Sequence, residues 1–118
     1  MPRITRDTHV KSVTIALNGN LSDAIDMRHF TMLIVHMPAA WTAASIGFKV
    51  SSSYGGTYQA LYDDDGDLVQ IDSPAASATY QANAEVAGAH WLKLWSQNGS
   101  GTNTAQAAAR TLALDLKS

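Results

Sequence analysis

The sequence of 118 residues predicts an all-β protein: a single antiparallel β-sandwich of seven or eight strands, with a jelly roll as the favoured topology. Three observations lead to this prediction. Short stretches alternate apolar and polar residues with the two-residue period of strands. Turn-forming Gly, Asn and Ser separate these stretches at intervals of roughly ten residues. No segment keeps helical spacing for more than about two turns.

The first half of the chain holds three predicted strands and one short extended piece. The strands are residues 13–17, 31–37 and 46–50, and the extended piece is 21–27. Residues 31–37 are apolar on both faces, which is typical of a central strand, and Pro38 ends them. His36 within this strand is expected to be a core histidine with satisfied hydrogen bonds. Trp41, in the next loop, is expected to pack across one end of the sandwich.

The second half holds four predicted strands, at residues 57–62, 67–71, 90–96 and 111–116. Residues 72–89 are loop-like, with one short strand around Thr79 to Gln81. A long polar connection follows residue 96, and its end at 104–110 favours a helical turn because alanine is the best helix former. No repeat or linker divides the chain, so residues 13–118 are predicted to form one β-sandwich domain.

Residues 1–12 differ from the rest because they have few apolar side chains and carry Arg3, Arg6 and Lys11. We expect them to form an N-terminal arm, mobile in the isolated protein and ordered along a neighbour in an assembly. Arg3 and Arg6 are therefore candidate contact residues.

The acidic stretch Asp63-Asp64-Asp65-Gly66-Asp67 has three interpretations: a calcium loop, a catalytic acid cluster or a turn. A calcium-binding EF-hand loop needs its glycine at position six and a glutamate at position twelve, and this stretch has neither. Asp-Gly between two strand-like runs is instead the strongest short-range hairpin signal. We therefore predict a hairpin with its tip at Asp64–Asp67, in which Asp63, Asp64, Asp65 and Asp67 are solvent-exposed and no metal is needed.

Composition argues against several functions. The net charge of -2, the pI near 6.0 and the absence of a basic run give no footprint for nucleic acid or an anionic membrane surface. There is no cysteine, which excludes disulfides and thiolate catalysis. The histidines show no metal-binding spacing, and no nucleophile elbow or phosphate-binding loop occurs. We expect no enzyme activity, no cofactor and no metal site.

Residues 90–96, HWLKLWS, are the most informative strand. If Leu92 and Leu94 face the core, Trp91, Lys93 and Trp95 project from the opposite face. Two tryptophans flanking a lysine form a candidate protein-contact surface, because Trp is enriched at interface hot spots. The same residues suit a sugar-stacking platform. The alternative is that Trp91 or Trp95 packs under a neighbouring loop.

Two sets of residues resemble a pattern found in small virion proteins of tailed bacteriophages. The first is Trp41, Ile46, Phe48, Ser51, Gly56, Tyr58, Leu61, Tyr62 and Gly66. The second is Gly88, Leu92, Lys93, Leu94, Ser96, Gln106, Arg110, Leu112 and Leu114. The resemblance spans residues 13–116, with departures in the loop after Ser96. It implies a phage structural protein of the jelly-roll type that cements or decorates the capsid.

The leading hypothesis is therefore a capsid decoration subunit that bridges neighbouring shell subunits. Its expected partners are the major capsid protein and copies of itself, as a homodimer or homotrimer, on the capsid exterior after synthesis in the host cytoplasm. A head–tail joint or tail accessory protein is the first alternative. A glycan-binding module that uses Trp91, Trp95 and the acidic loop with Ca²⁺ is the second, and a hydrolase is the weakest.

Overall fold

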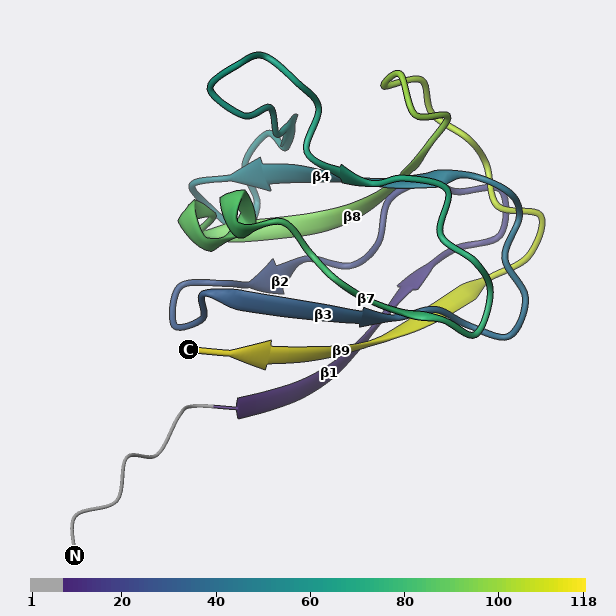
Figure 1. The fold of residues 1–118 in the computed structure, drawn as a ribbon, viewed down its shortest axis with the longest axis horizontal. Coiled ribbons are helices and arrows are strands. Elements are labelled where there is room, and N and C mark those ends of the chain that lie inside the picture. The colour runs from purple at the N-terminus through teal and green to yellow at the C-terminus, as the bar shows by residue number, and fades with distance from the viewer. Residues whose placement is uncertain (1–7) are drawn as a thin grey trace, which may run out of the picture.

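A computed structural model describes residues 8–118, which form two antiparallel β-sheets packed face to face (Figure 1). The strands are β1 (Thr8–Ile15), β2 (Ile25–Asp26), β3 (Met32–His36), β4 (Ser45–Ser51), β5 (Gln59–Ala60), β6 (Gln70–Ile71), β7 (Thr79–Gln81), β8 (Trp91–Gln97) and β9 (Arg110–Lys117). One 3₁₀ helix, η1 (Ala84–Gly88), precedes β8. No helix within residues 8–118 is both long and apolar enough to cross a membrane.

The strand order is that of a jelly roll. One sheet has the order β1-β9-β3-β7 and the other β2-β8-β4-β5, with β6 also pairing β4. Since β5 and β6 both run antiparallel to β4, they are two parts of one interrupted strand. When β5 and β6 are counted as one strand, the first strand pairs with the last (β1 with β9), the second with the second-last (β2 with β8) and the third with the third-last (β3 with β7). This is the pairing of a long hairpin rolled into two sheets. The predicted β-sandwich is confirmed.

The core lies between the sheets and follows the two-residue period of the strands. Leu33 and Val35 of β3 are fully buried, while the residues between and beside them are half-exposed on the outer face. The other fully buried apolar residues of the strands are Val13, Ile15, Ile25, Ile46, Phe48, Leu92, Leu94, Leu112, Leu114 and Leu116. Burying each such side chain contributes about 1.5–3 kcal/mol, so these apolar positions hold the two sheets together.

The first strand begins at Thr8 rather than at Val13. It pairs with β9 along its whole length, from Thr8↔Lys117 to Ile15↔Arg110. The ladder supplies backbone partners to residues 8–12 although few of their side chains are apolar, so hydropathy could not reveal them. Leu17, predicted to continue the alternation, lies beyond the strand and is 59% exposed. The rest of the predicted arm, with Arg3 and Arg6, lies outside the described residues.

Two further local predictions differ from the structure. Residues 104–110 form no helical turn, because the N–H of Gln106 donates to the carbonyl of Gly19 and its buried side chain donates to Thr42 and Ser96. His36 is not a core residue: its ring lies on the outer face of β3, 41% exposed, between Asp115 and Thr79. Trp41 packs against the core from its loop, as predicted, and donates its indole N–H to Ala44.

Candidate functional site

The outer face of the β2-β8-β4-β5 sheet carries the predicted contact residues. Leu92 and Leu94 point inward and are fully buried, so the predicted faces of β8 are correct. Trp91, Lys93 and Trp95 point to the opposite side, away from the sandwich core. The three side chains nevertheless have different surroundings.

Trp95 is covered and cannot serve as an open contact platform. It is only 3% exposed, and its indole N–H donates to Asn103 Oδ1 at 2.7 Å. The loop of residues 98–105 folds over the ring, with Gly101 close to Cη2. Gln97 fastens this loop, because its Oε1 accepts the N–H groups of Gly99 and Gly101. For Trp95, the interpretation that it packs under a neighbouring loop is therefore the correct one.

Trp91 is half-buried and holds a cation against its ring. The guanidinium carbon of Arg28 lies 5.0 Å from the centre of the Trp91 ring, and Tyr54 meets the same ring edge-on at 5.2 Å. Arg28 is oriented by Asp26, which accepts two side-chain hydrogen bonds at 2.8 and 2.9 Å. These hydrogen bonds lower the pKa of the Asp26 carboxyl from its usual 3.8 to about 2. Asp26 therefore stays charged and keeps the cation over the ring.

Two lysines form similar contacts beside Trp91. Lys93 Nζ lies 4.5 Å from the centre of the Tyr58 ring, and Lys49 Nζ lies 4.5 Å from the centre of the Trp95 ring. Tyr58 donates its hydroxyl to the carbonyl of Tyr54, and burial raises its pKa. We call this surface the cation–aromatic face; it comprises Arg28, Lys49, Tyr54, Tyr58, Trp91 and Lys93.

Sequence reasoning found Trp91 and Lys93 but missed the rest of the cation–aromatic face. Lys49 carries the clearest missed signal, since it alternates with Phe48 and Val50 in a predicted strand and so had to face outward. Tyr54 and Tyr58 come from the turn after β4, and Arg28 follows β2. Their positions depend on the pairing of β2 and β4 with β8, which no local pattern specifies.

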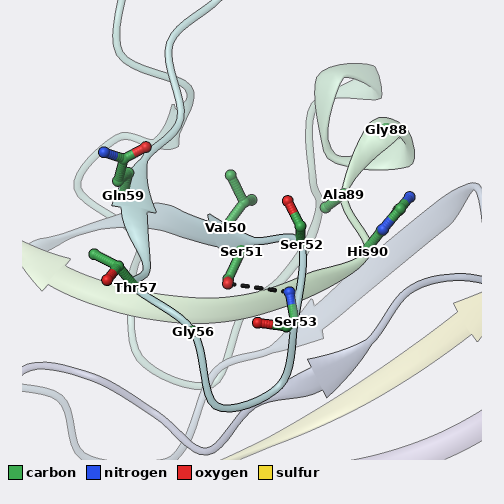
Figure 2. A pocket seen from close by; sticks show the side chains of 10 residues that line it. All are labelled: Val50, Ser51, Ser52, Ser53, Gly56, Thr57, Gln59, Gly88, Ala89 and His90. Carbon is green, nitrogen blue, oxygen red and sulfur yellow. Dashed lines mark hydrogen bonds between the residues drawn. The ribbon is translucent and has the colours of Figure 1, made fainter.

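A cleft of about 480 Å³ opens at the end of this sheet, between the serine-rich turn after β4 and η1 (Figure 2). Its lining residues are Val50, Ser51, Ser52, Ser53, Gly56, Thr57, Gln59, Gly88, Ala89 and His90. The turn is braced by Ser51 Oγ, which accepts the N–H of Ser53. The lining offers hydroxyl, amide and imidazole groups but no carboxylate, lysine or arginine, so it suits a neutral polar group.

The acidic stretch forms a hairpin that projects from the interrupted strand β5–β6 (Figure 1). The N–H of Asp63 donates to Asp67, and Gly66 takes the positive φ of 82° that a turn requires of glycine. The predicted hairpin is therefore confirmed, although it begins at Asp63. Asp63 is half-buried rather than exposed, because its Oδ1 accepts the N–H groups of Asp65 and Asp67.

Groups that could hold a metal are few in the part of the chain that the structure describes. Among residues 8–118, Asp63, Asp64 and Asp65 alone bring three suitable ligand atoms within 4.8 Å of one another. Two of them are exposed, as expected of a turn. The described histidines do not join them: His9 stacks on Phe30, and His36 bonds to Asp115.

One protein of known structure has the same fold. The SPBc2 prophage-derived protein YomS superposes with a TM-score of 0.65 at 16% sequence identity, over 100% of this chain and 99% of that chain. At this identity the likeness shows a shared fold. No family model and no curated protein sequence matches the chain.

Proposed function

We propose that this chain is a virion structural protein of a tailed phage, and specifically a capsid decoration subunit. The observation that carries the proposal is the fold shared with a prophage-derived protein from end to end of both chains. Two features support it further. The virion-type pattern of short motifs runs through the same jelly roll, and an outer sheet face presents aromatic rings and an arginine, which are residue types enriched at protein interfaces.

In this proposal the subunit acts by binding and not by catalysis. It would sit on the capsid exterior, after synthesis in the host cytoplasm, and bridge copies of the major capsid protein. The cation–aromatic face and the segment with Arg3 and Arg6 would supply protein contacts. No cofactor, nucleic acid or membrane takes part.

Copy number in the particle tests the proposal. Quantitative mass spectrometry of purified virions that encode this chain should count hundreds of copies, in a fixed ratio to the major capsid protein. A head–tail joint, the first alternative, would instead give about six or twelve copies, as expected of a ring at one vertex. Absence of the protein from purified particles would overturn both.

The cleft beside η1 favours the second alternative, a glycan-binding module. Its lining of neutral hydroxyl and amide groups is the chemistry that recognises sugar hydroxyls. Trp95, which the sequence suggested as a sugar platform, is covered and cannot take part. A glycan array with the purified protein, beside a Gln59→Ala control, separates this function from decoration: binding that depends on Gln59 would favour it.

A further inference from the structure

Lys49 and Lys93 form an uncompensated pair of like charges. They are register partners on the adjacent strands β4 and β8. Like charges directly opposite each other across two strands are destabilising. Among residues 8–118 the ion pairs are Arg28–Asp26 and His36–Asp115, so neither lysine has a carboxylate partner there. Each instead lies over an aromatic ring, which holds both ammonium groups on the cation–aromatic face.

Two carboxylates beside this face, those of Asp26 and Asp23, already accept hydrogen bonds. Asp26 binds Arg28 through both of its oxygens. Asp23 lines a small hollow with Lys93 and Tyr54, but its Oδ2 accepts the N–H of Thr14. A destabilising feature, such as this pair of like charges, that is not compensated within the same chain is typical of a functional site. The two lysines therefore call for an anionic partner from outside residues 8–118.

The same chain carries a matching anionic feature. The acidic hairpin of residues 63–67 projects from the edge of the β2-β8-β4-β5 sheet (Figure 1). Asp64, Asp65 and Asp67 are exposed, and none of them forms an ion pair with a described residue. Hydrogen bonds that the Asp63 carboxylate accepts fix the shape of the tip and leave these three carboxylates facing solvent.

We propose that the acidic hairpin of one copy docks on the cation–aromatic face of a second copy. Within residues 8–118, the two lysines of the face and the three exposed carboxylates of the hairpin form no ion pair, and each set acquires an opposite charge when two molecules meet. Because two different surfaces meet, the contact is heterologous and repeats from copy to copy into rings or rows. The inference deepens the proposed function, since it names how neighbouring decoration subunits would meet, but its test uses purified protein and needs no particle.

Charge reversal on each surface gives a paired test. One variant carries Lys49→Glu and Lys93→Glu, and the other carries Asp64→Lys, Asp65→Lys and Asp67→Lys, which leaves the hairpin with a net positive charge. Sedimentation velocity on the full chain should show self-association of the wild type that weakens as salt rises. Each variant alone should be monomeric, because its face and hairpin then carry the same sign. An equimolar mixture should associate again, because each variant's hairpin is complementary to the other's face.

Matched charge changes elsewhere serve as controls. Glu85→Lys, on exposed η1, and Lys117→Glu, on the other sheet, should associate as the wild type does. Thermal unfolding identifies a variant that fails to fold, and Lys93→Gln with Lys49→Gln then replaces the double Glu variant and should also lose association. A wild type that stays monomeric at low salt, variants that associate normally, or a mixture that stays monomeric would each overturn the proposal. If the copy number of the protein in virions contradicts a decoration role, the self-association of the purified protein is still tested separately by these variants.

Discussion

Gly47 lies directly under the indole of Trp95. The two residues are register partners on β4 and β8, and a Cβ at position 47 would come within 2.8 Å of Trp95 Cε3. The backbone of Gly47 does not have a positive φ, so a larger residue would meet a steric conflict and no backbone strain. Because position 47 has no side chain, the Trp95 ring can lie against the sheet, where the loop of residues 98–105 covers it.

Gly47→Ala should destabilise the protein by about 1–3 kcal/mol, because the indole must move and would strain its hydrogen bond to Asn103. Urea unfolding measures this change. Gly55→Ala is the control, since a Cβ there meets no atom within 4 Å. Equal stability of the two variants would show that the indole can shift at no cost.

Trp95→Ala should cost about 3–5 kcal/mol of unfolding free energy, as expected for deleting a fully covered indole. Trp91→Ala should cost clearly less, because Trp91 is half-buried and its ring faces Tyr54 and Arg28 at the surface. Denaturant unfolding of the two variants gives the comparison. A loss at Trp91 as large as that at Trp95 would mean that Trp91 is also a core residue.

The sequence could predict the fold because several long strands show an apolar period of two. The inward residues of β4 and β9 alternate with polar or small neighbours, whereas β3 is apolar on both faces, and these inward positions form part of the observed core. Strand β1 was harder to recognise, since backbone hydrogen bonds to β9 stabilise its polar first half. Backbone hydrogen bonds do not depend on side-chain hydropathy, so the apolar pattern could not reveal residues 8–12 as part of the strand.

The site was predicted only in part, for a similar reason. Alternation correctly placed Trp91, Lys93 and Trp95 on one face of β8. It could not show that a loop eight residues away would return to cover Trp95, through Asn103. Coverage of an outer face depends on loop conformation. Here the buried side chain of Gln97 fixes the loop that covers Trp95, and buried Gln106 likewise bonds to the backbone of another loop, at Thr42.

Gln106 is the clearest such glutamine, and its loss should be costly. It is fully buried; its amide nitrogen donates to Thr42 O and Ser96 Oγ, and its oxygen accepts from Thr42 N and Arg110 Nε. Gln106→Ala would leave several of these groups unpaired, so we expect a loss of at least about 2 kcal/mol. Exposed Gln81→Ala should change stability by less than about 0.5 kcal/mol. Similar values for both in urea unfolding would contradict a structural role for Gln106.

The acidic hairpin should depend on one of its carboxylates and on no metal. Asp63→Ala removes the acceptor of two backbone N–H groups, so we expect a loss of about 1–2 kcal/mol. Asp64→Ala, at an exposed position, should stay within about 0.5 kcal/mol of the wild type. Chelator should leave the melting temperature unchanged. A fall of more than about 5 °C would indicate a cation that stabilises the turn.

The ion pair of Asp26 and Arg28 should make stability depend on pH in one narrow window. The hydrogen bonds from Arg28 lower the pKa of Asp26 from 3.8 to about 2 in the folded protein, so the folded state favours the ionised carboxyl. The resulting stabilisation is complete above about pH 4 and disappears as the pH falls towards 2.

Asp26→Asn lacks this contribution, so its melting temperature should lie below that of the wild type at pH 6, and the difference should vanish near pH 2. The pair is exposed, so the difference at pH 6 will be small. Thermal unfolding of both proteins across this range measures it, with Asp64→Asn as a control that should follow the wild type throughout. A difference that stays constant down to pH 2 would mean that Asp26 acts by shape alone and that its charge does not hold Arg28 over Trp91.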